Sequence, residues 1–266
     1  MKPFELKKVP VALQYLRYKL VSSTAHDLHS PFVFDFYNNV IRDETPFYSY
    51  RAIESVRAKM LLSNAKINVL DLGTGGIKKR NRELPVSFIA KQYVKQAKDG
   101  QLLFRLVNRF RPANILEIGT SLGITTMYLA SPDSNANVIT LEGCPETASA
   151  AGKNFITAGV KNIQQITGEF SITLPDALKK MPHSDFVFFD GNHRKDATLN
   201  YFHQCLLKHD EQSVFVFDDI HWSRDMREAW KTIQQHEAVM LTIDLFNIGI
   251  VFFRKGLLKQ HFMLKY

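Results

Sequence analysis

Three carboxylates follow two apolar segments of this chain, and their spacing could hold a cation. Asp190 ends the apolar run 185–190, while Asp218 and Asp219 follow the next apolar run, 213–217. If the two runs are neighbouring parallel strands, the acids converge outside the carboxyl ends of the strands, where ligands collect. Carboxylates that lie so near one another repel unless a cation lies between them. Oxygen ligands suit a hard ion such as Mg²⁺. Such an ion could hold two substrate oxygens and lower the pKa of the one that reacts.

A second candidate site is the glycine turn that follows the apolar segment 114–118. Gly119 and Gly123 flank this turn, and an apolar run of helical character comes directly after it. Glycine lets the backbone approach a ligand where a Cβ would collide, and the start of the helix offers free N–H groups to an anion. Glu142 closes the next apolar run, 138–141, at about the distance expected of an acid that holds a ribose diol. The sequence therefore predicts a ligand with a ribose at this turn.

The spacing Glu117-x-Gly119-x-x-x-Gly123 resembles motif I of the class I S-adenosylmethionine-dependent methyltransferases. It differs from the G-x-G-x-x-G spacing of nicotinamide enzymes, which makes NAD the poorer ligand. The resemblance implies that the methionine end of the cofactor lies over the glycine turn and that Glu142 takes both ribose hydroxyls. A plain strand–helix turn that binds nothing is the alternative. The cofactor contacts that the resemblance implies are Glu117, Gly119, Thr120, Ser121, Gly123, Glu142, Gly143, Glu169 and Asp190.

The acids at 190, 218 and 219 resemble those of metal-dependent O-methyltransferases, both the catechol and caffeoyl types and the sugar-modifying type. This resemblance covers the chain from residue 114 onward. The resemblance implies that Asp190, Asp218 and Asp219 bind the metal. The general base of these enzymes lies three positions after the first Asp, where this chain has His193, and an imidazole is suited to take a proton near neutral pH. Catechol enzymes have Asn in place of Asp219 and Lys in place of His193. The departures favour a sugar-type or other aliphatic hydroxyl as the acceptor.

Other roles remain open for the same residues. Asp218 and Asp219 could cap the following helix and contact the cofactor amine without a metal, and His193 could bind the cofactor carboxylate. Glu169 could reach the adenine amine or be a surface acid. His221 could line the substrate pocket or be a packed structural histidine.

Strand and helix patterns alternate from residue 114 onward, which is typical of a parallel sheet with helices on both faces. We therefore expect an α/β fold, namely a Rossmann-like, doubly wound, mostly parallel seven-stranded sheet with a C-terminal antiparallel hairpin. Beyond the first strand–turn–helix unit, the expected helices are 145–156, 174–181, 196–207 and 224–235, and the expected strands are 163–167, 185–190, 213–217, 239–245 and 250–254.

The first part of the chain has a different character. We expect residues 1–98 to form a mainly helical extension that caps the active-site edge, or a dimerisation arm, and residues 99–266 to form the cofactor-binding domain. Helices are predicted over 11–21 and after Pro31. The segment 68–76 also reads as a strand and glycine loop, but a charged, proline-broken run follows it, so we expect a structural loop of the cap.

The composition bounds the class of protein. The chain has 266 residues, of which 45% are hydrophobic, so it can bury a core and is not disordered. Two cysteines are too few for a disulfide framework or a Cys-based zinc site, and no signal peptide or membrane span is evident, so we expect a cytoplasmic protein. The net charge of +8 permits an anionic partner, although a generally basic surface is at least as good an explanation.

These observations predict an S-adenosylmethionine-dependent methyltransferase that methylates an oxygen of a small hydroxylated molecule, with assistance from a divalent metal such as Mg²⁺. An RNA-directed methyltransferase is one alternative, because basic residues are frequent; a non-catalytic scaffold that retains the cofactor fold is another. Amino-group methylation of a nucleobase is unsupported, because no Asn/Asp-Pro-Pro-Tyr sequence follows the fourth strand. The basic residues behind the RNA alternative include Lys78, Lys79, Arg80, Arg82, Arg105, Arg109 and Arg111.

Overall fold

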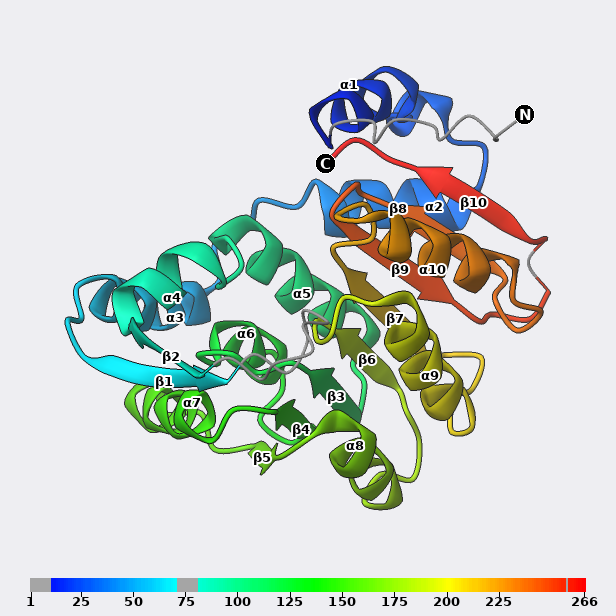
Figure 1. Ribbon diagram of the computed structural model, residues 1–266. Helices are drawn as coiled ribbons and strands as arrows, with labels where there is room; N and C mark the ends of the chain where they lie inside the picture. Colours follow the sequence, from blue (N-terminus) through cyan, green and yellow to red (C-terminus); the bar gives the residue numbers. More distant parts are fainter. Residues whose placement is uncertain (1–10, 71–80, 257) are drawn as a thin grey trace, which may run out of the picture.

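The centre of the protein is an eight-stranded mixed sheet, seen in a computed structural model that describes residues 11–70, 81–256 and 258–266 (Figure 1). The strand order is β10-β8-β9-β7-β6-β3-β4-β5, in which β9 runs antiparallel to both neighbours and the other pairs are parallel. This confirms the Rossmann-like sheet with its C-terminal hairpin, and β10 adds an edge strand that the sequence did not predict. The strands are β3 (Asn114–Ile118), β4 (Asn137–Glu142), β5 (Ile163–Thr167), β6 (Phe186–Phe189), β7 (Val214–Asp218), β8 (Leu241–Asp244), β9 (Ile248–Phe252) and β10 (Gln260–Met263).

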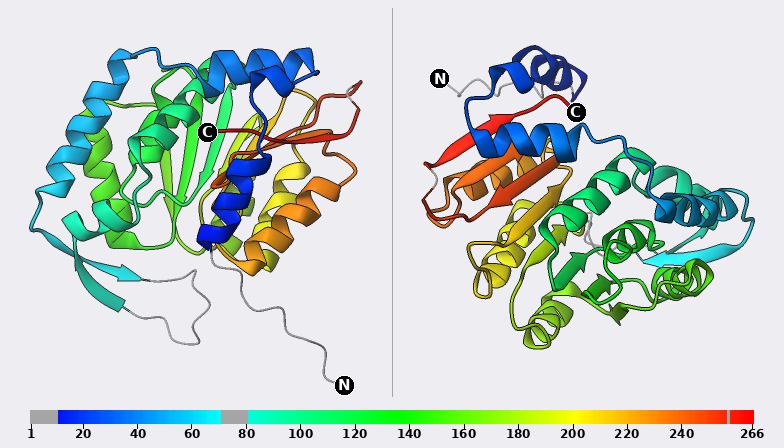
Figure 2. Two further views of the ribbon diagram at one scale, coloured as in Figure 1. Left: turned by 90° about the horizontal axis from the view of Figure 1, so that it is seen from above. Right: turned by 180° about the vertical axis from the view of Figure 1, so that it is seen from behind.

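Helices cover both faces of the sheet, as Figure 2 shows from two further directions. Successive residues of a strand point to opposite faces, so Phe186 and Phe188 of β6 pack on one side and Val187 and Phe189 on the other. The first face lies under α2 (Pro31–Phe36), the π-helical turn η2 (Tyr37–Ile41), α5 (Ala97–Phe110) and α6 (Ile124–Ala130), and the second lies under α8 (Phe170–Lys179), α9 (Lys195–Leu206) and α10 (Arg224–Gln235).

Local signals fix where the helices between the strands begin and end. Helix α7 (Pro145–Ala158) has Pro145 in its first turn, where no N–H is needed, and stops at Gly159, whose φ of +71° suits glycine. Helix α10 begins at Ser223, whose hydroxyl accepts a hydrogen bond from the Met226 N–H at 3.1 Å. The strand ends, and the acids on them, are thereby held at one edge of the sheet.

The N-terminal part is mainly helical, as predicted, but its helices are spread over the molecule. Helix α1 (Val11–Val21) lies beside β10 (Figure 1), and Phe36 of α2 packs edge-on against Phe252 of β9, with ring centroids 5.5 Å apart. Helices α3 (Tyr48–Leu61) and α4 (Val86–Gln92) share a second core with α6 and α7. The division of the chain at residue 98 stays a prediction.

The predicted second glycine loop begins in a separate small ribbon. Strand β1 (Lys66–Leu70) pairs antiparallel with β2 (Asn81–Pro85), apart from the main sheet. The glycines at 73, 75 and 76 lie outside the described residues. The ribbon docks on α7, where Glu146 accepts hydrogen bonds from the backbone and side-chain N–H groups of Asn68 at 2.6 and 2.8 Å.

A membrane-spanning helix was not expected. Over the described ranges, every helix is too short or too polar to cross a bilayer.

Candidate functional site

Glu142 lies beside the predicted glycine turn and is held there by backbone groups. Its Oε2 accepts a hydrogen bond from the Ser121 N–H at 2.8 Å, and its Oε1 accepts one from the Cys144 N–H at 2.9 Å. Burial raises the pKa of this carboxyl, and these backbone N–H groups oppose that rise. The acid at the end of β4 and the turn after β3 therefore form one unit, as the sequence predicted.

The backbone of the turn is left-handed at three positions. Gly119 has a φ of +110°, Ser121 of +49° and Gly123 of +83°, values that favour glycine or a short polar residue. A Cβ on Gly119 would overlap the backbone carbonyl oxygen of Asp190, and one on Gly123 would overlap the ring of Phe155. We expected these glycines to make room for a ligand; the structure shows that the fold itself needs them.

Glu117 is a fully buried acid of the site, as is Asp218. Glu117 lies in β3 and accepts hydrogen bonds on Oε2 from the hydroxyls of Thr126 and Thr140, the latter at 2.6 Å. Burial raises the pKa of the carboxyl to about 7, although the neighbouring threonine hydroxyls favour its charged form. Its Oε1 is buried and receives no hydrogen bond within the described part of the chain. One oxygen thus remains for a donor from a ligand.

The other predicted cofactor contacts lie around this centre. Thr120 is buried, and its hydroxyl lies 2.6 Å from that of Thr140. Gly143 follows Glu142, and its backbone N–H faces the carboxylate of Glu142. Glu169 is exposed at the start of α8, beyond the edge strand β5, so it lies farther from the turn in the sheet order.

The structure brings the predicted acids of β6 and β7 together with His193. Ligand atoms of Asp190, His193 and Asp218 lie within 4.8 Å of one another. His193 Nε2 is 3.7 Å from Asp190 Oδ1 and 3.9 Å from Asp219 Oδ2. Asp219 itself has a φ of +54°, which turns the chain immediately after the strand.

Lys95 also reaches this acidic end, and sequence reasoning did not predict it. It comes from the loop between α4 and α5, and its ammonium pairs with Asp218 Oδ2 and lies 3.5 Å from Asp219 Oδ1. The Lys95 side chain is 16% exposed and that of Asp218 is 1% exposed, so the pair is shielded from water. A lysine in a polar loop has no spacing signal that would connect it to acids this far along the chain.

Burial and charge act against each other at this end. Burial raises the pKa of Asp190 to about 6, although the Lys95 ammonium opposes the rise. Burial and the carboxylate of Asp190 raise the pKa of Asp218 well above its usual range. Burial alone would lower the pKa of Lys95, but Asp218, Asp190 and Asp219 outweigh it and raise that pKa. The three carboxylates therefore favour the charged form of the lysine.

The same oxygens bear on the predicted divalent ion. Carboxylates from two strand ends are the right donor chemistry for Mg²⁺. However, the ammonium of Lys95 already lies against Asp218 and Asp219. An ion bound by Asp190, Asp218 and Asp219 would have to displace a like charge, so these residues do not fit the ion as they stand.

Two other candidate bases, His221 and Lys195, already have partners outside the acidic end. The Nε2 atom of His221 is 2.8 Å from Asp244 Oδ2, and the His221 ring stacks on Phe246. Lys195 pairs with Glu228 of α10 at 3.1 Å. His193 is thus the group best placed among them to accept a proton beside the acids.

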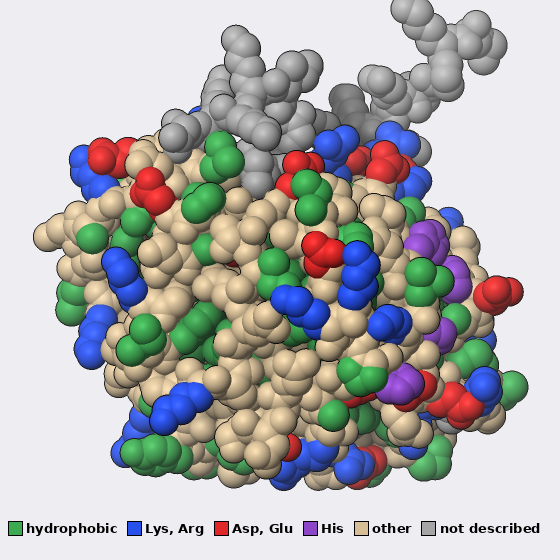
Figure 3. Space-filling model, turned by 90° about the horizontal axis from the view of Figure 1, so that it is seen from below, with side chains coloured by type: hydrophobic (Ala, Val, Ile, Leu, Met, Phe, Trp, Pro, Cys, Tyr) green, Lys and Arg blue, Asp and Glu red, His purple; other side chains and the backbone are tan. Residues whose placement is uncertain are grey.

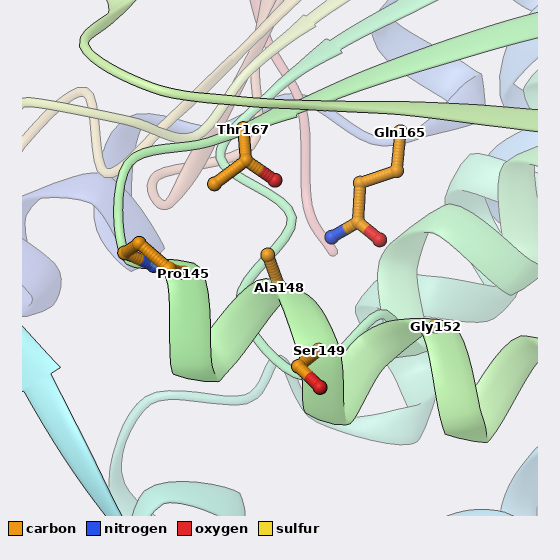
Figure 4. A pocket seen from close by; sticks show the side chains of 6 residues that line it. All are labelled: Pro145, Ala148, Ser149, Gly152, Gln165 and Thr167. Atoms are coloured by element: carbon orange, nitrogen blue, oxygen red, sulfur yellow. The ribbon is translucent and has the colours of Figure 1, made fainter.

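A surface hollow of about 400 Å³ lies between α7 and β5 (Figure 4). Gln165 and Thr167 face Ala148 and Ser149 across it. It is open to solvent at the edge of the sheet and contains none of the predicted site residues, so it is not the reaction site.

Comparison with known proteins supports a methyltransferase domain in this chain. Residues 116–220 match the family model described as a methyltransferase domain. The chain is 32% identical over 124 residues to a catechol O-methyltransferase of Niastella koreensis and 31% identical over 126 residues to one of Mycobacterium tuberculosis. These matches cover 46% and 47% of this chain and 55% and 56% of the relatives, so the chain spans about half the length of the curated relatives it matches.

Solved structures share the fold at low sequence identity. One is an O-methyltransferase from Bacillus cereus in complex with S-adenosylhomocysteine, with a TM-score of 0.55, 20% identity, and coverage of 83% of this chain and 97% of that chain. Another, from Streptomyces achromogenes in complex with S-adenosylmethionine, has a TM-score of 0.57, 18% identity, and coverage of 79% and 91%.

Proposed function

We propose that this chain, which carries a class I S-adenosylmethionine-dependent methyltransferase domain, methylates an oxygen of a small hydroxylated molecule. The observation that carries the proposal is the joint geometry of Glu142 and the glycine turn. Glu142 is fixed by the Ser121 and Cys144 N–H groups at the edge of a left-handed turn, where a ribose diol and an amino-acid end can be bound side by side.

Two acids and backbone N–H groups bind different parts of the cofactor in this proposal. Glu142 accepts hydrogen bonds from the ribose hydroxyls. The free Oε1 of Glu117 accepts one from the cofactor amine, which would satisfy a buried atom that otherwise has no donor in the described residues. The Ser121 N–H donates to Glu142 and the Gly123 N–H donates to the Thr120 carbonyl oxygen, so the cofactor carboxylate accepts from N–H groups at the start of α6 instead. Thr120, Gly143 and Asp190 complete the set, and the predicted contact Glu169 is left out because it is exposed beyond the edge strand β5.

The acceptor side lies next to this turn, because the backbone of Asp190 packs against Gly119. When bound, the cofactor supplies a transferable methyl group. His193 takes the proton from the acceptor hydroxyl, and the oxygen then attacks the methyl carbon in line with the bond that breaks. Alignment of the two reactants is the main contribution of the protein, and His193 is partly exposed, so an acceptor can reach it.

The predicted magnesium site at Asp190, Asp218 and Asp219 is not part of this proposal. No step above passes through a metal, because Lys95 occupies the oxygens that would bind it.

The direct test is methyl transfer itself. Purified protein is incubated with labelled S-adenosylmethionine and a panel of hydroxylated small molecules, and the products are examined for one added methyl group on oxygen. We expect at least one acceptor to be methylated by the wild type, and more slowly by Glu142→Ala when S-adenosylmethionine is kept below saturation. Label transferred to RNA alone would favour the RNA-directed alternative.

The remaining expectations about partners stay predictions. Figure 3 shows Lys and Arg side chains scattered among Asp and Glu side chains on one face, and Lys78, Lys79 and Arg80 lie outside the described residues. That arrangement lends little support to an extended RNA surface. A homodimer and a cytoplasmic location also remain to be tested, the first by sedimentation and the second by fractionation.

A further inference from the structure

Lys95 lies at the acidic end, just before a helix that is firmly packed in the fold. It lies in the short loop between α4 and α5, and α5 is anchored by the buried side chains of Leu102 and Leu103. Near the start of α5, Gly100 lies so close to the ring of Tyr128 that a Cβ there would overlap it. The position of Lys95 is therefore fixed by the fold, whereas a lysine on the surface would be free to swing.

Few other groups could take the place of Lys95 as the ion-pair partner of Asp218. Both oxygens of Asp218 are buried, and among the described residues Lys95 is the only Lys or Arg whose side chain comes within ion-pair distance of them. A buried carboxylate without a partner is strongly destabilising, so the ammonium is the contact that balances its charge. Asp219 lies within ion-pair distance of the same ammonium.

A metal ion and this ammonium would compete for the same place. A divalent ion held by Asp218 and Asp219 would lie within a few ångströms of Lys95, where like charges repel. From these contacts we propose, resting on the methyl transfer proposed above, that Lys95 is the built-in cation of the acceptor site and that a divalent ion is excluded while Lys95 is present.

The lysine also has a chemical use in that position. An ammonium carries three N–H donors, and the pair with Asp218 and the approach to Asp219 engage two of them. The third can donate to the acceptor oxygen as it loses its proton to His193, which lies on the other side of Asp219. Charge that develops on that oxygen is then stabilised without a metal.

The experiment measures Mn²⁺ binding by electron paramagnetic resonance and calorimetry, with no acceptor present. We compare the wild type with Lys95→Met and with Lys91→Met, a control whose lysine is exposed at the end of α4. The wild type and Lys91→Met should show no saturable Mn²⁺ site at the acidic end. Lys95→Met should bind one ion at least about tenfold more tightly, and adding Asp218→Asn to it should remove that ion.

Two results would overturn the proposal. One is a wild-type Mn²⁺ site that is lost in Asp218→Asn, a result that does not require any Lys95 variant to fold. The other is a Lys95→Met protein with native circular dichroism that binds Mn²⁺ no better than the wild type. Failure of the methyl-transfer proposal is separate, because it shows as absent S-adenosylhomocysteine binding and absent product whatever the Mn²⁺ result.

Discussion

The cofactor end and the acceptor end of the site balance their charges in different ways. At the cofactor end, Glu142 is held by backbone N–H groups of its own loop and of the adjacent turn. At the acceptor end, Asp218 and Asp219 rely on one long side chain, Lys95, from a loop far upstream in the chain. A site made of backbone groups tolerates side-chain changes around it, whereas a site that depends on one ammonium changes its chemistry when that residue changes.

The difference predicts where each substitution should act. Changes at the cofactor end should alter binding of S-adenosylmethionine, and changes at the acceptor end should alter the rate and the response to metals.

His193→Ala should cause the largest loss. Removal of a positioned base lowers the rate on the order of 10²–10⁴-fold, while the affinity for S-adenosylhomocysteine should stay at the wild-type value. The measurement is initial rate with an acceptor identified in the screen. His221→Ala is the matched control, because His221 is engaged with Asp244; a greater loss there would make His221 the base.

Glu117→Gln should change how stability depends on pH. The pKa of Glu117 is raised to about 7 in the folded protein from an ordinary 4.5. The folded state thus binds more protons than the unfolded state between these values, and this residue's contribution to the free energy of unfolding falls as pH rises through that window. Glutamine does not titrate.

We therefore expect the free energy of unfolding of Glu117→Gln, relative to the wild type, to rise by on the order of 2–3 kcal/mol between about pH 5 and about pH 8. Denaturant titrations without ligand measure it, with the exposed Glu169→Gln as a control that should show no such trend. A pH-independent difference between Glu117→Gln and the wild type would contradict the burial argument.

Glu169→Ala should have the smallest effect. The side chain is exposed at the start of α8, and exposed substitutions change free energies by no more than about 0.5 kcal/mol. Calorimetry with S-adenosylhomocysteine decides between this result and a larger loss, which would place Glu169 on the adenine.

Much of the fold was predictable, because it follows from local periodicity. The apolar runs of β3 to β7 and the caps of α7 and α10 are contiguous signals, and the helix 224–235 was predicted to the residue. Strand β10 was missed, since it is a four-residue edge strand whose sequence, Gln260-His261-Phe262-Met263, has no alternating apolar pattern and whose first two residues are exposed. Its place depends on pairing with β8, which no local pattern shows.

The site was predictable to the same extent. Glu142 and the glycine turn were found together because the motif is short and continuous. The acids at the ends of β6 and β7 were found because a parallel sheet gathers its carboxyl ends. Lys95 could not be found, because its role depends on how α5 packs over the sheet. The structural need for glycine at positions 119 and 123 was also not predictable, because it comes from the close approach of Asp190 and Phe155.

The central claim is that the unit of Glu142 and the glycine turn binds S-adenosylmethionine independently of the acidic end. The most direct measurement is calorimetric titration of S-adenosylhomocysteine into the wild type, Glu142→Ala and His193→Ala. The account predicts that Glu142→Ala loses roughly 1.5–3 kcal/mol of binding free energy, the usual contribution of hydrogen bonds to a charged group, and that His193→Ala loses none. Wild-type affinity in Glu142→Ala, or no binding by the wild-type protein, would contradict it.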